Sequence, residues 1–297
     1  MSRLQAEVVA RVPTAEGYGD LAAAWFTQAR AEIFPDFDPP GRAAGTLEVR
    51  REPVLVGGSE ANYSGSAWRR LLGNLASQHP FHVQLLMDAL DEHGQPMRPD
   101  RGATVGVHRN HGQPEWVTFE IEGTIGVSGS TEPDAVRPYP GELKWAAFVK
   151  RWAIRADACY AHVSDDTEVM MGTALEQATT RDPASPWFAR TPEETVPRCC
   201  EVLRGYSWVT VCSAELAAAL GGAGALAGSG AFDEVSELPR GQVFLRATPT
   251  LAEYQGTALR RVFEVLAPVL LTGRPDPMNW AMEHVRVVPD VDAADYQ

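Results

Sequence analysis

The residues of this chain that could do chemistry are chiefly its histidines and their acidic neighbours. His108 and His111 flank a turn and could supply two metal ligands, although their spacing differs from the His-Glu-x-x-His pattern of helical zinc sites. His162 could pair with Asp165 in a weak cation site, but a strand histidine followed by a helix-capping carboxylate is the more ordinary arrangement. We therefore expect no metal ion and no cofactor. These four residues remain the candidate ligands of an alternative, a metal-dependent hydrolase with a dispersed site.

Motifs of nucleophilic or phosphate chemistry are absent from the sequence. The chain has no Gly-x-Ser-x-Gly elbow to present a catalytic serine. Residues 126–130 are rich in glycine and serine but lack the Gly-Lys-Ser/Thr ending of a phosphate-binding loop. The glycines at 221–224 follow an expected helix, which favours a helix C-cap over a dinucleotide-binding turn. The sequence therefore favours a protein that is not an enzyme.

Two kinds of residue are candidates for binding a protein partner. Trp116 and Trp187 lie close to prolines, so we expect both to be partly exposed, and tryptophan is common among the dominant residues of protein interfaces. Asp233, Glu234 and Glu237 gather around one turn. They form either a solvated edge or a negative patch that meets a basic protein.

Charge and hydropathy exclude two classes of partner. The net charge of −13 argues against a nucleic-acid-binding protein, because a phosphate backbone requires a basic surface. No run of eighteen apolar residues occurs, so we expect no membrane span. The first residues lack the apolar core of a signal peptide, and we expect a cytoplasmic protein.

The four cysteines suggest a reducing environment. Adjacent Cys199 and Cys200 are poorly spaced for a disulfide framework, and no Cys-x-x-Cys pair is present for zinc. Cys159 and Cys212 fall in apolar runs, where a cysteine is usually a small buried hydrophobic residue. This usage fits a compartment in which thiols stay reduced.

Hydrophobic periodicity predicts a chain of alternating helices and strands. Helices are expected after Pro13 as far as Phe34, and over residues 64–78, 141–156, 168–180 and 250–271. Ser66 is a plausible cap of the second helix, and Pro268 should bend or end the last one. Expected strands are 4–12, 46–51, 53–56, 81–90, 158–163 and 285–288, with antiparallel pairs 103–108/115–121 and 232–238/242–247.

The order of these elements predicts an α+β fold. We expect antiparallel or mixed sheets with amphipathic helices packed on one face, and a possible arrangement of two similar split-βαβ-like halves. Residues 181–197 contain four prolines and are the expected linker. It would separate an N-terminal half, 1–180, from a C-terminal half, 198–297, although one continuous domain remains an alternative.

Residues 203–222 are the most clearly punctuated stretch of the chain. They predict a strand on which Tyr206 and Trp208 share one face, then a helix that begins at Ser213 and ends at Gly221 and Gly222. The strand Arg-Gly-Tyr-x-Trp that includes Gly205, the helix start Ser-Ala-Glu-Leu and the Leu-Gly-Gly stop resemble the immunity-protein family of type VI secretion and related polymorphic toxin systems.

This resemblance covers mainly residues 200–271 and differs at Val209-Thr210, where the family often has a Gly-Asn pair. It implies a cytoplasmic α+β protein that binds a cognate toxin and blocks it by occlusion, and it transfers no catalytic residue. We therefore expect a non-enzymatic immunity-type protein with a protein partner, no nucleic acid, no membrane and a possible homodimer. The alternatives are the hydrolase above and a structural component of a phage or secretion particle.

Overall fold

The chain divides into two units, residues 1–128 and residues 129–297. The computed structural model describes residues 2–35, 43–50, 59–62, 64–89, 102–125, 141–165, 192–273, 286–288 and 290–297. The linker expected at 181–197 lies within the second unit. Its last residues, from Pro192 onward, are helical (α4, Pro192–Thr195, then a 3₁₀ turn, Val196–Arg198).

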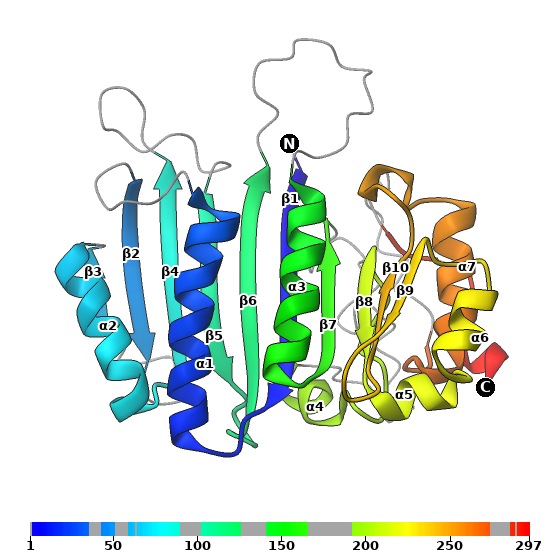
Figure 1. Ribbon diagram of the computed structural model, residues 1–297, viewed down its shortest axis with the longest axis horizontal. Helices are drawn as coiled ribbons and strands as arrows, with labels where there is room; N and C mark the ends of the chain where they lie inside the picture. The colour runs from blue at the N-terminus through cyan, green and yellow to red at the C-terminus, as the bar shows by residue number, and fades with distance from the viewer. Residues whose placement is uncertain are drawn as a thin grey trace, which may run out of the picture. The chain divides into compact units, whose positions relative to one another are not determined.

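The first unit contains an antiparallel sheet of six strands among its described residues. The strands are β1 (Ser2–Arg11), β2 (Ala43–Arg50), β3 (Ser59–Asn62), β4 (His82–Ala89), β5 (Gly102–Arg109) and β6 (Trp116–Ile125). Their order in space is β3-β2-β4-β5-β6-β1 (Figure 1). The expected hairpin of β5 and β6 is confirmed, with Val107 opposite Phe119.

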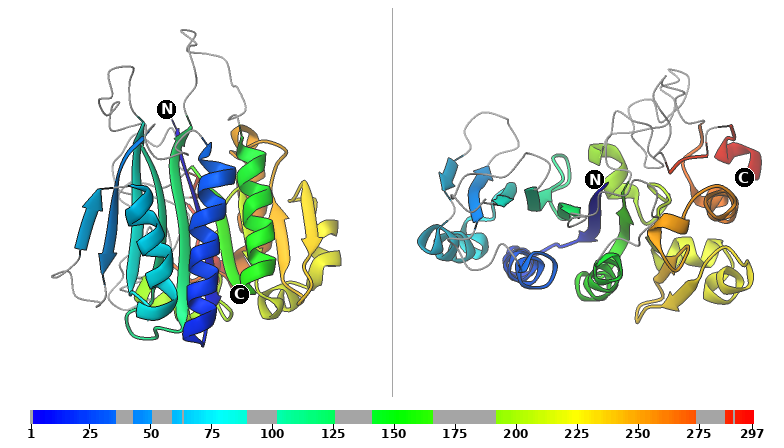
Figure 2. Two further views of the ribbon diagram at one scale, coloured as in Figure 1. Left: turned by 60° about the vertical axis from the view of Figure 1, so that its left-hand side comes forward. Right: turned by 90° about the horizontal axis from the view of Figure 1, so that it is seen from above.

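Two helices, α1 (Ala15–Gln28) and α2 (Gly65–Gln78), cover one face of this sheet (Figure 2). Thr14 caps α1 by accepting a hydrogen bond from the Gly17 amide, and a π-helical turn, Ala29–Ile33, extends its end. The cap of α2 is Ser64, whose hydroxyl accepts from the Ala67 amide. Ser66, the cap expected from the sequence, lies within the helix because the extended backbone of Ser64 begins it two residues earlier.

The second unit contains a shorter antiparallel sheet and its own helices. Its described strands are β7 (Ala158–Ser164), β8 (Val209–Cys212), β9 (Glu234–Glu237) and β10 (Val243–Arg246), in the spatial order β7-β8-β10-β9. Helix α3 (Glu142–Ala156) packs against β7 and β8 and buries Trp145, Phe148 and Trp152. The pairing of β7 with β8 joins strands from both sides of the expected linker.

Tyr206 and Trp208 do not lie in the strand that the sequence predicts for them. Strand β8 begins at Val209, so Tyr206 and Trp208 precede it. The Ser207 amide donates to the Thr210 hydroxyl (3.0 Å), which donates back to the Ser207 carbonyl (3.4 Å), and this local loop replaces strand pairing. Tyr206 and Trp208 are both buried, as the sequence predicts.

The helical part of this stretch follows the prediction. Ser213 caps α5 (Ala214–Ala219) by accepting from the Leu216 amide, and Gly221 and Gly222 have positive φ angles of 85° and 80°. A further helix, α6 (Gly222–Gly228), begins directly at these glycines.

The end of the chain contributes one amphipathic helix and several short turns. Helix α7 (Thr257–Leu266) buries Leu259, Val262, Phe263 and Leu266, and it passes into a 3₁₀ turn, Ala267–Val269, at Pro268. Other 3₁₀ turns are Leu251–Glu253 and Ala293–Tyr296. Residues 286–288 do not form the expected strand, and the elements expected at 53–56 and 168–180 lie outside the described residues.

The fold is α+β with antiparallel strand pairing, as the sequence predicts. The strand order is β3-β2-β4-β5-β6-β1 in the first unit and β7-β8-β10-β9 in the second. No helix in the described part of the chain is long and apolar enough to cross a membrane.

Candidate functional site

The first unit carries polar residues on the sheet face turned away from its helices. Phe119 packs against Trp25 of α1, with 5.5 Å between ring centroids, so its strand neighbours Thr118 and Glu120 point to the other side. Register extends this assignment to β1, β2, β4 and β5. We call the set the polar sheet face: Gln5, Glu7, Arg11, Glu48, Arg50, His82, Gln84, Thr104, His108, Thr118, Glu120 and Glu122.

Two features of this face are not required by the fold. Glu7, only 9% exposed, lies directly opposite Glu120 on the neighbouring strand. Like charges directly opposite each other destabilise a sheet unless neighbouring groups compensate them, and Glu120 is in contact with His108. Among the described side chains the face holds four glutamates and two arginines, Arg11 and Arg50, and the Arg50 Nε donates to Glu48 at 2.6 Å. Its chemistry suits a basic ligand or a basic protein surface.

A histidine pair lies at the centre of the polar sheet face. His82 and His108 are opposite one another, with stacked rings 5.2 Å apart and 3.3 Å between their Nδ1 atoms. His108 Nε2 approaches Glu120 Oε2 at 3.0 Å. Burial, the neighbouring His108 and the Arg50 guanidinium together lower the pKa of His82 to about 4, so its ring is neutral at pH 7.

The low pKa of His82 predicts a loss of stability in acid. The unfolded chain binds a proton at this residue near pH 6.5, whereas the folded protein binds it near pH 4. Between these values the unfolded state holds more protons, so stability falls as the pH drops from about 6.5 to about 4. Thermal unfolding of the His82→Gln variant should show a shallower pH dependence in this window than the wild type.

The matched control is His111→Gln, because His111 is an exposed histidine of the β5–β6 turn. Its pH profile should follow that of the wild type. A His82→Gln profile that is as steep as the wild-type profile would contradict the assignment.

The four candidate metal ligands are not assembled into a metal site. His108 contacts His82 and Glu120, and the His111 ring packs edge-on against Phe81. In the second unit His162 is 1% exposed on β7, and Asp165 accepts two hydrogen bonds from Arg286. None of the four belongs to a group of three or more potential ligands within the described residues.

Among the candidate partner-binding residues, Trp116 differs from its expected exposure. Trp116 is 7% exposed at the start of β6, so the prediction of partial exposure is wrong. Trp187 lies outside the described residues. Asp233 and Glu234 pair with Arg246, at 2.7 and 3.1 Å, and both Asp233 and Glu237 are exposed. A role for these acids in partner binding stays a prediction.

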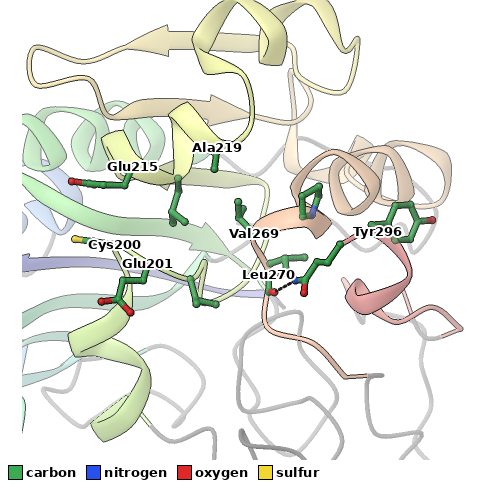
Figure 3. A pocket seen from close by; sticks show the side chains of 11 residues that line it. Cys200, Glu201, Glu215, Ala219, Val269, Leu270 and Tyr296 are labelled. Atoms are coloured by element: carbon green, nitrogen blue, oxygen red, sulfur yellow. Dashed lines mark hydrogen bonds between the residues drawn. The ribbon is translucent and has the colours of Figure 1, made fainter.

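A pocket of about 650 Å³ opens in the second unit (Figure 3). Its wall is mainly apolar and includes Leu216, Val269 and Leu270, with Glu201 and Glu215 as its carboxylates. The Gln297 side chain also lines the pocket and donates to the Leu270 carbonyl at 2.8 Å. An apolar pocket with two acids is suited to binding an apolar or basic group.

Cys200 also lines this pocket and forms a disulfide with Cys159 of β7. The sequence-based expectation of four reduced cysteines is therefore corrected. The bond joins residues 41 positions apart, which no local spacing could indicate. Cys212 is buried as expected, and burial raises its pKa to about 12.

Comparison with known proteins adds information about the fold. No protein-family model matches the chain, and no curated protein matches it. Among solved structures, the Pseudomonas aeruginosa T6SS protein PA0821 aligns with a TM-score of 0.55 over 99% of this chain and 81% of that one, with 14% identity. The chain resembles a T6SS protein in fold. At this identity the likeness concerns the fold alone.

The polar sheet face was missed at the sequence level, although part of its signal is present there. Residues 4–8 and 117–122 alternate apolar and polar side chains, as expected for a strand with one polar face. The alternation marks Glu7, Glu120 and Glu122 individually. It does not indicate that Glu7 lies opposite Glu120, because that depends on the register of distant strands.

Proposed function

We propose that this chain is a non-enzymatic immunity-type protein associated with type VI secretion, which binds a cognate toxin and neutralises it by occlusion. The observation that carries the proposal is the fold likeness to a T6SS protein over 99% of the chain. The resemblance of residues 200–271 to type VI immunity proteins supports it independently, because it rests on sequence motifs.

The polar sheet face is the proposed docking surface for the toxin. Its four glutamates and the chain's net charge of −13 favour a partner with a basic surface. The half-buried His82, His108 and Glu120 offer hydrogen-bonding groups that can select one partner over another. A face built on strands holds such groups more rigidly than a loop does.

The function is tested by co-expression with the toxic product of the neighbouring gene. The proposal predicts rescue of growth and a complex that elutes together in gel filtration. The same run on the chain alone reports whether it forms a homodimer. Failure of both rescue and complex formation would exclude the proposed function.

The docking surface is tested by a charge introduced at its centre. Gln84→Lys adds a positive charge to the polar sheet face without removing a carboxylate. We expect it to weaken toxin binding by at least about tenfold, because a basic partner is then repelled on approach. Binding is measured by titration calorimetry at two salt concentrations, and the loss should be smaller at the higher one.

Asp20→Lys is the matched control, since Asp20 is exposed on α1 over the opposite face. It changes the net charge in the same direction and should leave affinity nearly unchanged. Equal affinities for both variants and the wild type would remove the polar sheet face from the interface while leaving the function in place.

A further inference from the structure

Three cysteines from distant parts of the chain meet in the second unit. Cys159 is in β7, whereas Cys199 and Cys200 follow the 3₁₀ turn Val196–Arg198. Their three sulfur atoms lie within 4.8 Å of one another. In the described parts of the chain this is the one group of three potential metal ligands at such distances.

The backbone that holds these sulfurs does not depend on the disulfide. Pairing of β7 with β8, with Tyr160 opposite Cys212, fixes the strand that carries Cys159. On the other side, the Ser213 hydroxyl donates to the Cys200 carbonyl at 3.1 Å, and the Cys199 amide donates to the Val196 carbonyl. The three sulfurs should therefore stay close together when the disulfide is reduced.

The cysteine cluster is partly shielded from solvent and partly next to a pocket. Cys199 is completely buried, which protects a bound ion from competing water. Cys200 is one of the residues that line the 650 Å³ pocket, so the cluster borders this pocket at Cys200 (Figure 3). A site with three protein ligands and one side open to a pocket can leave its fourth position to water or to an external ligand.

We infer that reduced Cys159, Cys199 and Cys200 form a binding site for one thiophilic metal ion, Zn²⁺ or Cu⁺. Thiolates are the ligands that these ions prefer. A zinc ion with Zn–S bonds of about 2.3 Å separates its sulfur ligands by roughly 3.8 Å, so small side-chain rotations would bring the three sulfurs into position.

The disulfide and the metal site are alternative states of the same sulfurs. A dithiol reductant transfers two electrons and two protons to the Cys159–Cys200 bond, giving two thiols while the reductant itself becomes a disulfide. Metal binding then displaces up to three protons from the three thiols. A disulfide oxidant that accepts two electrons from the Cys159 and Cys200 thiolates would itself become two thiols, re-form the Cys159–Cys200 bond and release the ion, so occupancy follows the thiol–disulfide balance of the surroundings.

The test is a metal titration of the full chain, reduced under anaerobic conditions until a denatured sample of it shows four free thiols. Zn²⁺ and Cu⁺ are each titrated against a chromophoric chelator, and Co²⁺ serves as a spectroscopic probe of thiolate ligation. We expect one equivalent of Zn²⁺ or Cu⁺ to bind with a dissociation constant on the order of 1 μM or lower. Co²⁺ should give thiolate charge-transfer absorption in the near ultraviolet.

Cys199→Ser should weaken binding by at least about 100-fold and abolish the cobalt absorption, because it removes one ligand. Cys212→Ala is the control: it removes a buried cysteine outside the cluster and should bind like the wild type. Circular dichroism of the metal-free variants checks that both fold. The oxidised protein should bind at least about tenfold more weakly than the reduced protein.

Either of two results would overturn the inference. One is fully reduced, folded protein that binds neither Zn²⁺ nor Cu⁺. The other is a Cys199→Ser variant that binds as tightly as the wild type.

Discussion

Trp208→Ala is expected to lower the free energy of unfolding of the second unit by about 3–5 kcal/mol, the usual cost of deleting a large buried aromatic side chain. Trp208 is fully buried, and its indole N–H donates to the Thr248 carbonyl at 3.0 Å. Its own carbonyl accepts from the Ala247 amide at 2.9 Å, next to β10. The substitution leaves a cavity beside this strand and removes the donor from the Thr248 carbonyl.

A graded series separates packing from hydrogen bonding at this position. Trp208→Phe keeps most of the apolar contact but loses the N–H donor, so we expect a smaller loss of about 1–3 kcal/mol. Leu143→Ala is the surface control, because Leu143 is 52% exposed on α3, and it should change stability by less than about 0.5 kcal/mol. Urea unfolding followed by far-ultraviolet circular dichroism measures all three. If Trp208→Ala and Trp208→Phe lowered the free energy of unfolding by similar amounts, packing of the indole ring would not be its dominant contribution.

The elements of the fold were predictable because their signals are local. The pair β9 and β10 is marked by its Pro-Arg-Gly turn, and α7 by a repeating apolar face that Pro268 interrupts. Ser213 was recognisable as a helix cap from its position before Ala-Glu-Leu. Each of these features depends on residues only a few positions apart.

The candidate sites were not predictable, because they depend on contacts between distant residues. His82 meets His108 through the register of β4 and β5. Cys159 reaches Cys200 only after β7 is placed in its sheet. The local loop at Ser207 shows a second limit: a side-chain hydrogen bond to the backbone outweighed the strand propensity of the aromatic residues beside it.

Asp165→Ala is expected to lower the free energy of unfolding by about 3–5 kcal/mol, because it removes a carboxylate that accepts two hydrogen bonds from a largely buried arginine. The Arg286 side chain is 12% exposed and that of Asp165 is 5% exposed. Two parallel hydrogen bonds, of 3.0 and 2.9 Å, join the guanidinium to the carboxylate. Arg286 also donates to the Tyr254 carbonyl at 2.8 Å, so the pair ties three distant segments of the second unit together.

A second ion pair of the same chemistry serves as the control. Arg260 also donates twice to one aspartate, Asp290, but both side chains are largely exposed to solvent. Water screens that pair, so Arg260→Ala should have a far smaller effect than Asp165→Ala. The measurement is urea unfolding at pH 7 for both variants, and equal losses would contradict burial as the cause.

The double variant Asp165→Leu/Arg286→Met tests whether the cost of Asp165→Ala comes from the stranded charge. Replacing both partners with apolar residues removes the uncompensated guanidinium and fills the space with hydrocarbon. We therefore expect the double variant to be more stable than Asp165→Ala, although it lacks both hydrogen bonds. A double variant less stable than Asp165→Ala would contradict this explanation. The two hydrogen bonds between Arg286 and Asp165 would then stabilise the unit by more than the burial of their charges destabilises it.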